Sequence, residues 1–318
     1  MVALMGGMGA PHRPVLLNET VDLLQAKRGG LFVDGTLGLG GHSEAILEAS
    51  LDARVIGIDR DREALELARK RLAHFGSRFI GVHGDFREIR RVVGAANEPD
   101  VQGVLVDLGV SSLQFDSGER GFSFRQDAPL DMRMDASGED ETAAALLARL
   151  PEEEIARIIF EYGEERRSRR IARWIVERRE RDDPIERTGE LADLVARAVR
   201  ARKTDRVHPA TRTFQALRIA VNRELEGLAE FVEEAIDLLQ PDGRFAAISF
   251  HSLEDRIMKR ILRRLAGHCE CSRDTPVCSC GARREVEILT RRPLVPSEDE
   301  VAENPRARSA KLRACRKL

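Results

Sequence analysis

Short apolar runs alternate with helical patterns over the first third of the chain. Strands are expected at Leu31–Asp34, Val55–Asp59, Phe79–Val82 and Gly103–Asp107. Between them, 41–50 and 62–75 carry apolar residues at the three- and four-residue steps typical of helices. Strands that alternate with helices form a parallel sheet covered by helices. The pattern therefore predicts an α/β fold with a doubly wound, Rossmann-like sheet.

A long helical insertion is expected before the next strand. That strand, Arg244–Phe250, begins more than 130 residues after Asp107, which is far longer than an ordinary crossover. Helical patterns occur at 142–150, 152–162, 167–181, 188–201 and, as one long helix, 214–239. We therefore predict a sheet domain made of residues 1–113 and 214–318, and an inserted all-helical cap domain at 114–213.

A glycine-rich loop follows the first predicted strand. The strand ends at Asp34, and glycines stand at 35, 38, 40 and 41 before a helix begins. Glycine permits positive φ and lets a ligand approach the backbone amides at a helix start. The dinucleotide pattern G-x-G-x-x-G is matched only in part, because Ser43 occupies its third glycine position, and the Gly-Lys-Ser/Thr of a phosphate loop does not follow. A tight structural turn is the alternative.

Acidic residues end three of the predicted strands, at Asp34, Asp59 and Asp107. Ligands of open α/β sheets bind beyond the carboxyl ends of the strands, so these acids are expected to line one crevice. Asp59 is placed to accept hydrogen bonds from the ribose hydroxyls of an adenosine ligand. Both S-adenosylmethionine and NAD contain that ribose, and the missing third glycine favours S-adenosylmethionine over an NAD-dependent dehydrogenase.

Several long blocks resemble one known family, the small-subunit ribosomal RNA cytidine-N4 methyltransferases called RsmH or MraW. The blocks are His12–Leu17, Asp34–Thr36 with Gly40–Ser43, Asp107–Ser112, Glu119–Phe124, Pro129–Met134, His208–Ala216, Ser249–Arg256 and Asn304–Ser309. Their number and order make the resemblance specific, and it runs nearly from end to end.

The resemblance implies methylation of the exocyclic N4 of a cytidine in the decoding region of 16S ribosomal RNA, with S-adenosylmethionine as the donor. It implies that the sheet domain is the methyltransferase domain and that the cap domain helps to hold the RNA. By position, the donor-binding residues would be Gly40, Gly41, His42, Asp59, Phe86, Asp107 and Gln114.

Catalysis at a cytidine amino group requires an acceptor for its N–H bonds, because the N4 lone pair is delocalised into the ring. Asp107 is the first candidate, and His251, just after the last predicted strand, is the second. Amino-group methyltransferases of other families often place Asp-Pro-Pro-Tyr at the end of strand four, whereas this chain has Asp107-Leu-Gly-Val. We therefore expect Phe115, Phe122 or Phe124 to stack on the base, with packing of these rings as the alternative.

Charge is unevenly distributed, although the net charge is only −2. Residues 166–181 carry eight arginines, and 304–318 carry six Lys or Arg with no acid. Such runs fit RNA phosphates or form solvated helix faces. The expected partner is 16S ribosomal RNA or the assembled small ribosomal subunit. A non-catalytic RNA-binding or assembly factor that keeps the donor loop is the competing hypothesis.

Four of the five cysteines lie close together, at Cys269, Cys271, Cys278 and Cys280. This clustering predicts a structural zinc site, although the spacing differs from the usual C-x-x-C, and reduced thiols are the alternative. Clustered cysteines, the absence of a basic start at 1–10, and the lack of any apolar run of about 18 residues favour a cytoplasmic protein with no membrane partner. The sequence leaves open whether the chain forms a homodimer.

Overall fold

The computed structural model describes residues 14–96, 100–109, 120–136, 138, 140–200, 208–269, 271 and 282–318. The chain divides into two compact units, a sheet unit (Met1–Gly109 with Ala229–Leu318) and a helical unit (Val110–Leu228). In the described ranges, no helix is long and apolar enough to span a bilayer.

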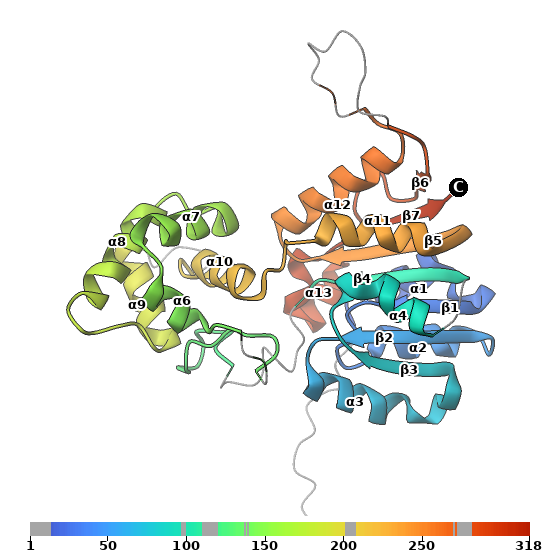
Figure 1. Ribbon diagram of the computed structural model, residues 1–318, viewed down its shortest axis with the longest axis horizontal. Helices are drawn as coiled ribbons and strands as arrows, with labels where there is room; N and C mark the ends of the chain where they lie inside the picture. Colours follow the sequence, from blue (N-terminus) through green and yellow to red (C-terminus); the bar gives the residue numbers. More distant parts are fainter. Residues whose placement is uncertain are drawn as a thin grey trace, which may run out of the picture. The chain divides into compact units, whose positions relative to one another are not determined.

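A seven-stranded sheet forms the centre of the sheet unit (Figure 1). Its strands are β1 (Gly30–Asp34), β2 (Ala53–Asp59), β3 (Phe79–His83), β4 (Val101–Asp107), β5 (Leu239–Ser249), β6 (Val286–Ile288) and β7 (Lys311–Lys317). They lie in the order β3-β2-β1-β4-β5-β7-β6; β1 to β5 pair in parallel, and β7 is antiparallel to both β5 and β6. The expected α/β class and doubly wound sheet are confirmed, and the chain order reverses between β1 and β4.

Helices cover this sheet, and buried apolar residues of several of them join its core. They are α1 (Leu17–Leu24), α2 (Gly41–Ala49), α3 (Arg62–Leu72), α4 (Ile89–Ala95), α11 (Leu228–Leu238), α12 (Ser252–Leu265) and α13 (Glu298–Glu303). Phe32 of β1, Leu47 of α2, Leu65 of α3 and Leu105 of β4 belong to one buried cluster. The strand ends that carry the acids are thereby held by close packing.

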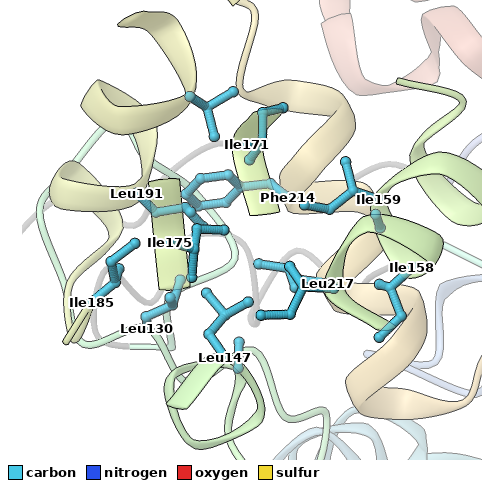
Figure 2. Close-up of a cluster of buried hydrophobic side chains, with 14 of the residues drawn as sticks. Leu130, Leu147, Ile158, Ile159, Ile171, Ile175, Ile185, Leu191, Phe214 and Leu217 are labelled. Atoms are coloured by element: carbon cyan, nitrogen blue, oxygen red, sulfur yellow. The ribbon is translucent and has the colours of Figure 1, made fainter. Parts of the chain in front are cut away.

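In the ranges that the structure describes, five helices build the helical unit around its own core. They are α6 (Ala143–Arg149), α7 (Glu152–Gly163), α8 (Ser168–Arg179), α9 (Thr188–Val199) and α10 (Thr211–Asn222). Figure 2 shows Ile159 of α7, Ile171 of α8, Leu191 of α9 and Phe214 of α10 converging in this core. Helix α10 therefore packs in the helical unit, whereas the sequence pattern assigned residues from 214 onward to the sheet domain.

The single long helix predicted at 214–239 is wrong. Helix α10 ends at Asn222, Arg223 adopts a left-handed conformation (φ 50), and α11 begins only at Leu228. Phe214 is buried in the helical core, while Phe231 of α11 is buried in the sheet unit. The break lets each half bury its own apolar face, which periodicity alone did not reveal.

The basic segment near the C-terminus was not expected to be a strand, yet 311–317 forms β7 between β5 and β6. Its Arg313 Nε donates to Asp255 Oδ1 of α12 at 2.6 Å and is only 7% exposed. Arg316 pairs with Glu287 and Asp242. These basic side chains balance acids of the same unit, so they do not form a free positive surface.

Candidate active site

The loop after β1 is held against the ends of β2 and β4 by hydrogen bonds. The Gly38 amide donates to Asp59 Oδ2 at 2.6 Å, and the Asp61 amide donates to Asp59 Oδ1 at 2.8 Å. The Asp107 amide donates to Thr36 Oγ1 at 2.6 Å. The structure thus brings Asp59 and Asp107 to opposite sides of the glycine-rich loop, as the sheet topology predicts.

Ser43, which breaks the dinucleotide pattern, has a specific partner. Its hydroxyl donates to Asp34 Oδ2 at 2.7 Å, and the Thr36 amide donates to Asp34 Oδ1 at 3.2 Å. Burial raises the pKa of Asp34 to about 6, against the lowering effect of these two donors. A glycine at 43 would leave the buried Asp34 carboxyl without one donor, so this position requires a hydroxyl. Sequence reasoning missed this role of Ser43 and that of Thr36.

Backbone conformation explains two of the loop glycines and opens the start of α2. Gly38 and Gly40 have φ of 52 and 78, which side-chain-bearing residues adopt at a cost. Gly40 is the N-cap of α2 and provides no side-chain cap for the first amides of that helix. A side chain on Gly41 would approach Pro14 Cγ to 2.3 Å. The first backbone amides of α2 are therefore uncapped and lie near the buried Asp34. This arrangement can bind a polar nucleoside ligand.

Phe86 begins the short helix η3 (Phe86–Glu88) after β3 and lies next to the loop. A Cβ added to Gly35 would lie 3.1 Å from Phe86 Cβ, so Gly35 allows this close approach. The ring packs edge-on against Phe231 with centroids 4.7 Å apart, and the residue is half-buried. A fixed, partly open aromatic ring suits an adenine face, which agrees with the prediction for Phe86 without testing it.

Asp107 has an unsatisfied oxygen at the end of β4. Its Oδ1 is buried and has no hydrogen-bond partner among the residues that the structure describes, although the side chain as a whole is 23% exposed. Burial, and after it the carboxyls of Asp34 and Glu254, raise the pKa of Asp107 to about 7, against the lowering effect of the Gly109 amide. A buried acceptor with no donor is the feature that a bound amino group would satisfy.

The two predicted histidines have different surroundings. His42 is buried and its Nε2 bonds to the Val15 carbonyl, so any contact of His42 with S-adenosylmethionine would come from its backbone. His251 is the N-cap of α12: Nδ1 accepts from the Glu254 amide at 3.4 Å, and Nε2 lies 3.0 Å from Glu254 Oε1. Nδ1 of His251 thus caps α12, while the buried Nε2 has no hydrogen-bond partner among the described residues, so the proton-transfer role stays a prediction.

Other predicted residues are outside the described part of the chain or lie in packed positions. Two segments that hold predicted site residues, 110–119 and 272–281, are outside the described residues. They contain Gln114, Phe115, Cys278 and Cys280. Cys269 is exposed and Cys271 is partly buried. Phe122 is buried in the helical core, which fits the packing alternative and not base stacking. Phe124 is partly buried and lies against His208, with ring centroids 4.5 Å apart.

The sheet, its glycine-rich loop and the acids after β2 and β4 together define a nucleoside-ligand site of the type used by S-adenosylmethionine-dependent methyltransferases. The model of the MraW methylase family matches residues 9–318. The chain belongs to this family.

Sequence relatives support the same assignment. The chain is 56% identical to "Ribosomal RNA small subunit methyltransferase H" of Geobacter sulfurreducens over 309 residues, which cover 96% of this chain and 99% of the relative. It is 52% identical to the protein of the same name from Carboxydothermus hydrogenoformans, over 96% and 98% of the two chains. A solved rRNA methylase from Streptococcus thermophilus has a TM-score of 0.43 at 11% identity, over 98% of this chain and 99% of that one. The family assignment depends on the sequence relatives.

Proposed function

We propose that this protein transfers a methyl group from S-adenosylmethionine to the exocyclic N4 of a cytidine in the decoding region of 16S ribosomal RNA. The observation that carries the proposal is the buried Oδ1 of Asp107 next to the glycine-rich donor loop, which has no hydrogen-bond partner in the part of the chain that the structure describes. An amino group placed at Asp107 would satisfy this oxygen and become a better nucleophile.

S-adenosylmethionine supplies an electrophilic methyl group on a sulfonium. In-line displacement requires collinear reacting atoms, so the residues of this chain act mainly by positioning. Asp59 would hold the ribose, Phe86 the adenine, and the amides at Gly40–His42 the polar end of the donor. Asp107 would accept an N–H bond of N4. Gln114 completes the predicted donor set from outside the described residues.

The function is tested by incubating the full chain with S-adenosylmethionine and undermethylated small subunits, and in parallel with naked 16S RNA. We expect one N4-methylcytidine, mapped to the decoding region by mass spectrometry of RNA fragments. Donor binding without methyl incorporation into either substrate would favour the binding-factor hypothesis. If calorimetry showed that the chain binds NAD and not S-adenosylmethionine, the result would favour the hypothesis of an NAD-dependent dehydrogenase.

The helical unit is proposed to cap the donor site and to hold the RNA through part of its arginine run. Structural contacts use several of the eight arginines: Arg178 pairs with Asp183 and Glu190, and Arg179 Nη1 donates to the carbonyls of Leu147, Ala148 and Leu150. Arg166, Arg167 and Arg169, around the start of α8, are exposed and have no acidic partner within the described ranges. Together with the exposed Arg181 at the end of the run, these arginines are available to RNA phosphates.

Replacing Arg166, Arg167 and Arg169 together by Ala is expected to raise the KM for RNA about 10-fold or more. The slope of the logarithm of the RNA-binding constant against the logarithm of the salt concentration should become shallower by about 2. The thermal midpoint should hardly change, because these side chains make no ion pair among the described residues. Steady-state methylation and RNA binding at several salt concentrations measure both effects.

Arg157→Ala is the matched control for this variant. Arg157 is also exposed and in the helical unit, but Glu154 and Glu161 already neutralise it. Its loss should leave the KM for RNA unchanged. Equal effects of the two variants would indicate general electrostatic attraction and contradict a specific phosphate surface at the start of α8.

We propose that Cys269, Cys271, Cys278 and Cys280 hold one structural zinc ion, because four thiolates within a short segment suit tetrahedral coordination. Elemental analysis of the protein purified without chelator should then give about one zinc per chain, and replacement of Cys269 and Cys271 by Ser should abolish it. Zinc-free protein with unchanged thermal stability would contradict the site.

A cytoplasmic location and a homodimer are also proposed, and sedimentation of the purified chain tests the dimer.

A further inference from the structure

A hydrogen bond to the Val15 carbonyl orients the His42 ring. His42 lies in the first turn of α2, and its Nε2 is 3.1 Å from the carbonyl oxygen of Val15. A carbonyl oxygen can only accept a hydrogen bond, so Nε2 must carry a hydrogen. In its neutral form the ring therefore has its lone pair on Nδ1.

That nitrogen faces the carboxyl group at the end of β4. His42 Nδ1 lies 3.9 Å from Asp107 Oδ2, and the two side chains are 7% and 23% exposed. With Nδ1 unprotonated and Asp107 ionised, two lone-pair-bearing atoms would face each other at a poorly solvated place. One proton, on either group, converts this repulsion into an attraction.

The charged groups near this pair increase its affinity for a proton. Asp34 on β1 and Glu254 on α12 both face Asp107, and both are acidic. Asp59 on β2 adds a third carboxyl beside Asp34. The raised pKa of Asp107, about 7, agrees with the geometry. The local field therefore favours one retained proton near neutral pH.

We propose that His42 and Asp107 form a coupled ion pair that together holds one proton near neutral pH, and that the Asp107 carboxylate of this pair receives the proton released from N4 during methyl transfer. The second part depends on the proposed function. The N4 lone pair forms the new N–C bond, the C–S electron pair remains on sulfur, and one N4 proton passes to the Asp107 carboxylate. His42 acts through Asp107 as a positioning residue: its Nδ1–H stabilises the carboxylate before transfer.

The coupled protonation of His42 and Asp107 can be tested without activity, by nuclear magnetic resonance of the full chain with ¹⁵N-labelled histidine. The His42→Gln variant assigns the His42 signals. We expect the neutral form to carry its hydrogen on Nε2, and Asp107→Asn to lower the apparent pKa of His42 by about one unit or more, because the imidazolium loses its counter-ion. A hydrogen on Nδ1 in the neutral form, or an unchanged His42 titration in Asp107→Asn, would overturn the pair.

The role in methyl transfer is tested by single-turnover rates across pH. In His42→Gln the side-chain amide can still donate to the Val15 carbonyl, so the affinity for S-adenosylmethionine should stay within about threefold. We expect the rate at pH 7 to fall about 10-fold and the midpoint of the pH profile to move by about one unit. The exposed His74, changed to Gln, is the control and should alter neither.

The possible failures are distinguishable. A His42→Gln enzyme with the wild-type rate and pH profile would overturn the catalytic role of the pair while the proposed function stands. A wild-type chain that methylates no cytidine would overturn the proposed function, and the resonance measurement would still decide whether the protonation of the two groups is coupled.

Discussion

Asp107→Asn is expected to slow methyl transfer severely while making the sheet unit more stable at pH 8. The amide offers N4 a weaker acceptor and cannot take its proton, so the single-turnover rate should fall about 10²-fold or more. The folded pKa of Asp107, about 7, lies above its ordinary value of 3.8. The stability that this carboxyl contributes is therefore present at low pH and is lost as pH rises between these two values.

Above pH 7 the wild-type protein must keep a poorly solvated carboxylate, and the Asn variant does not. We expect a stability gain on the order of 1–2 kcal/mol, less than the full shift implies because the side chain is 23% exposed. Thermal unfolding at pH 6 and pH 8 measures it, and the gain should be larger at pH 8. A variant that is less stable than wild type at pH 8, or that methylates normally, would contradict the role given to Asp107.

Asp255→Asn provides a control of opposite sign. Burial acts to raise the pKa of Asp255, but its bonds to Arg313 and Lys311 outweigh burial and lower it. The stability that the ionised Asp255 carboxylate contributes is present above its ordinary pKa of 3.8 and is lost as pH falls. Neutralising Asp255 should therefore destabilise the protein at pH 8, where neutralising Asp107 stabilises it.

Asp59→Ala is expected to raise the dissociation constant for S-adenosylmethionine about 100-fold or more. The substitution removes the predicted ribose acceptor and frees the Gly38 and Asp61 amides that the carboxylate now holds. Asp59→Asn keeps one acceptor oxygen, so about a 10-fold loss is expected. Calorimetric titration of the donor measures both variants.

Asp61→Ala separates donor binding from local folding in the same segment. The Asp61 carboxylate caps α3 by accepting from the Glu63 and Ala64 amides. Its loss should cost about 1 kcal/mol of stability and leave donor affinity nearly unchanged. If Asp59→Ala weakened donor binding no more than Asp61→Ala, the role of Asp59 would be limited to loop structure.

Much of the sheet and of the donor loop could be predicted from the sequence because the signals there are local. Apolar runs ending in Asp34, Asp59 and Asp107 predict strands, and parallel strands place their carboxyl ends on one edge. The helices of the helical unit were likewise indicated by periodicity within each segment, and α6 to α9 begin and end close to the predicted limits.

The errors occur where distant contacts outweigh local pattern. The segment 214–239 has continuous helical periodicity, but Phe214 and Phe231 are buried in different cores, so the chain breaks at Arg223. The strand 311–317 reads as a basic tail because its partners, Asp255 and Glu287, lie 20 or more residues away in the sequence. Neither the second core nor these partners can be read from the segment itself.

The sequence by itself determined the family, the α/β class, and a donor loop flanked by strand-end acids. Only the tertiary structure decided which groups of that loop interact: Ser43 with Asp34, Gly38 with Asp59, and His42 with Asp107. Residue type specifies what each side chain can donate or accept. Burial and the choice of partner decide its protonation, and both arise from packing elements that are far apart in the chain.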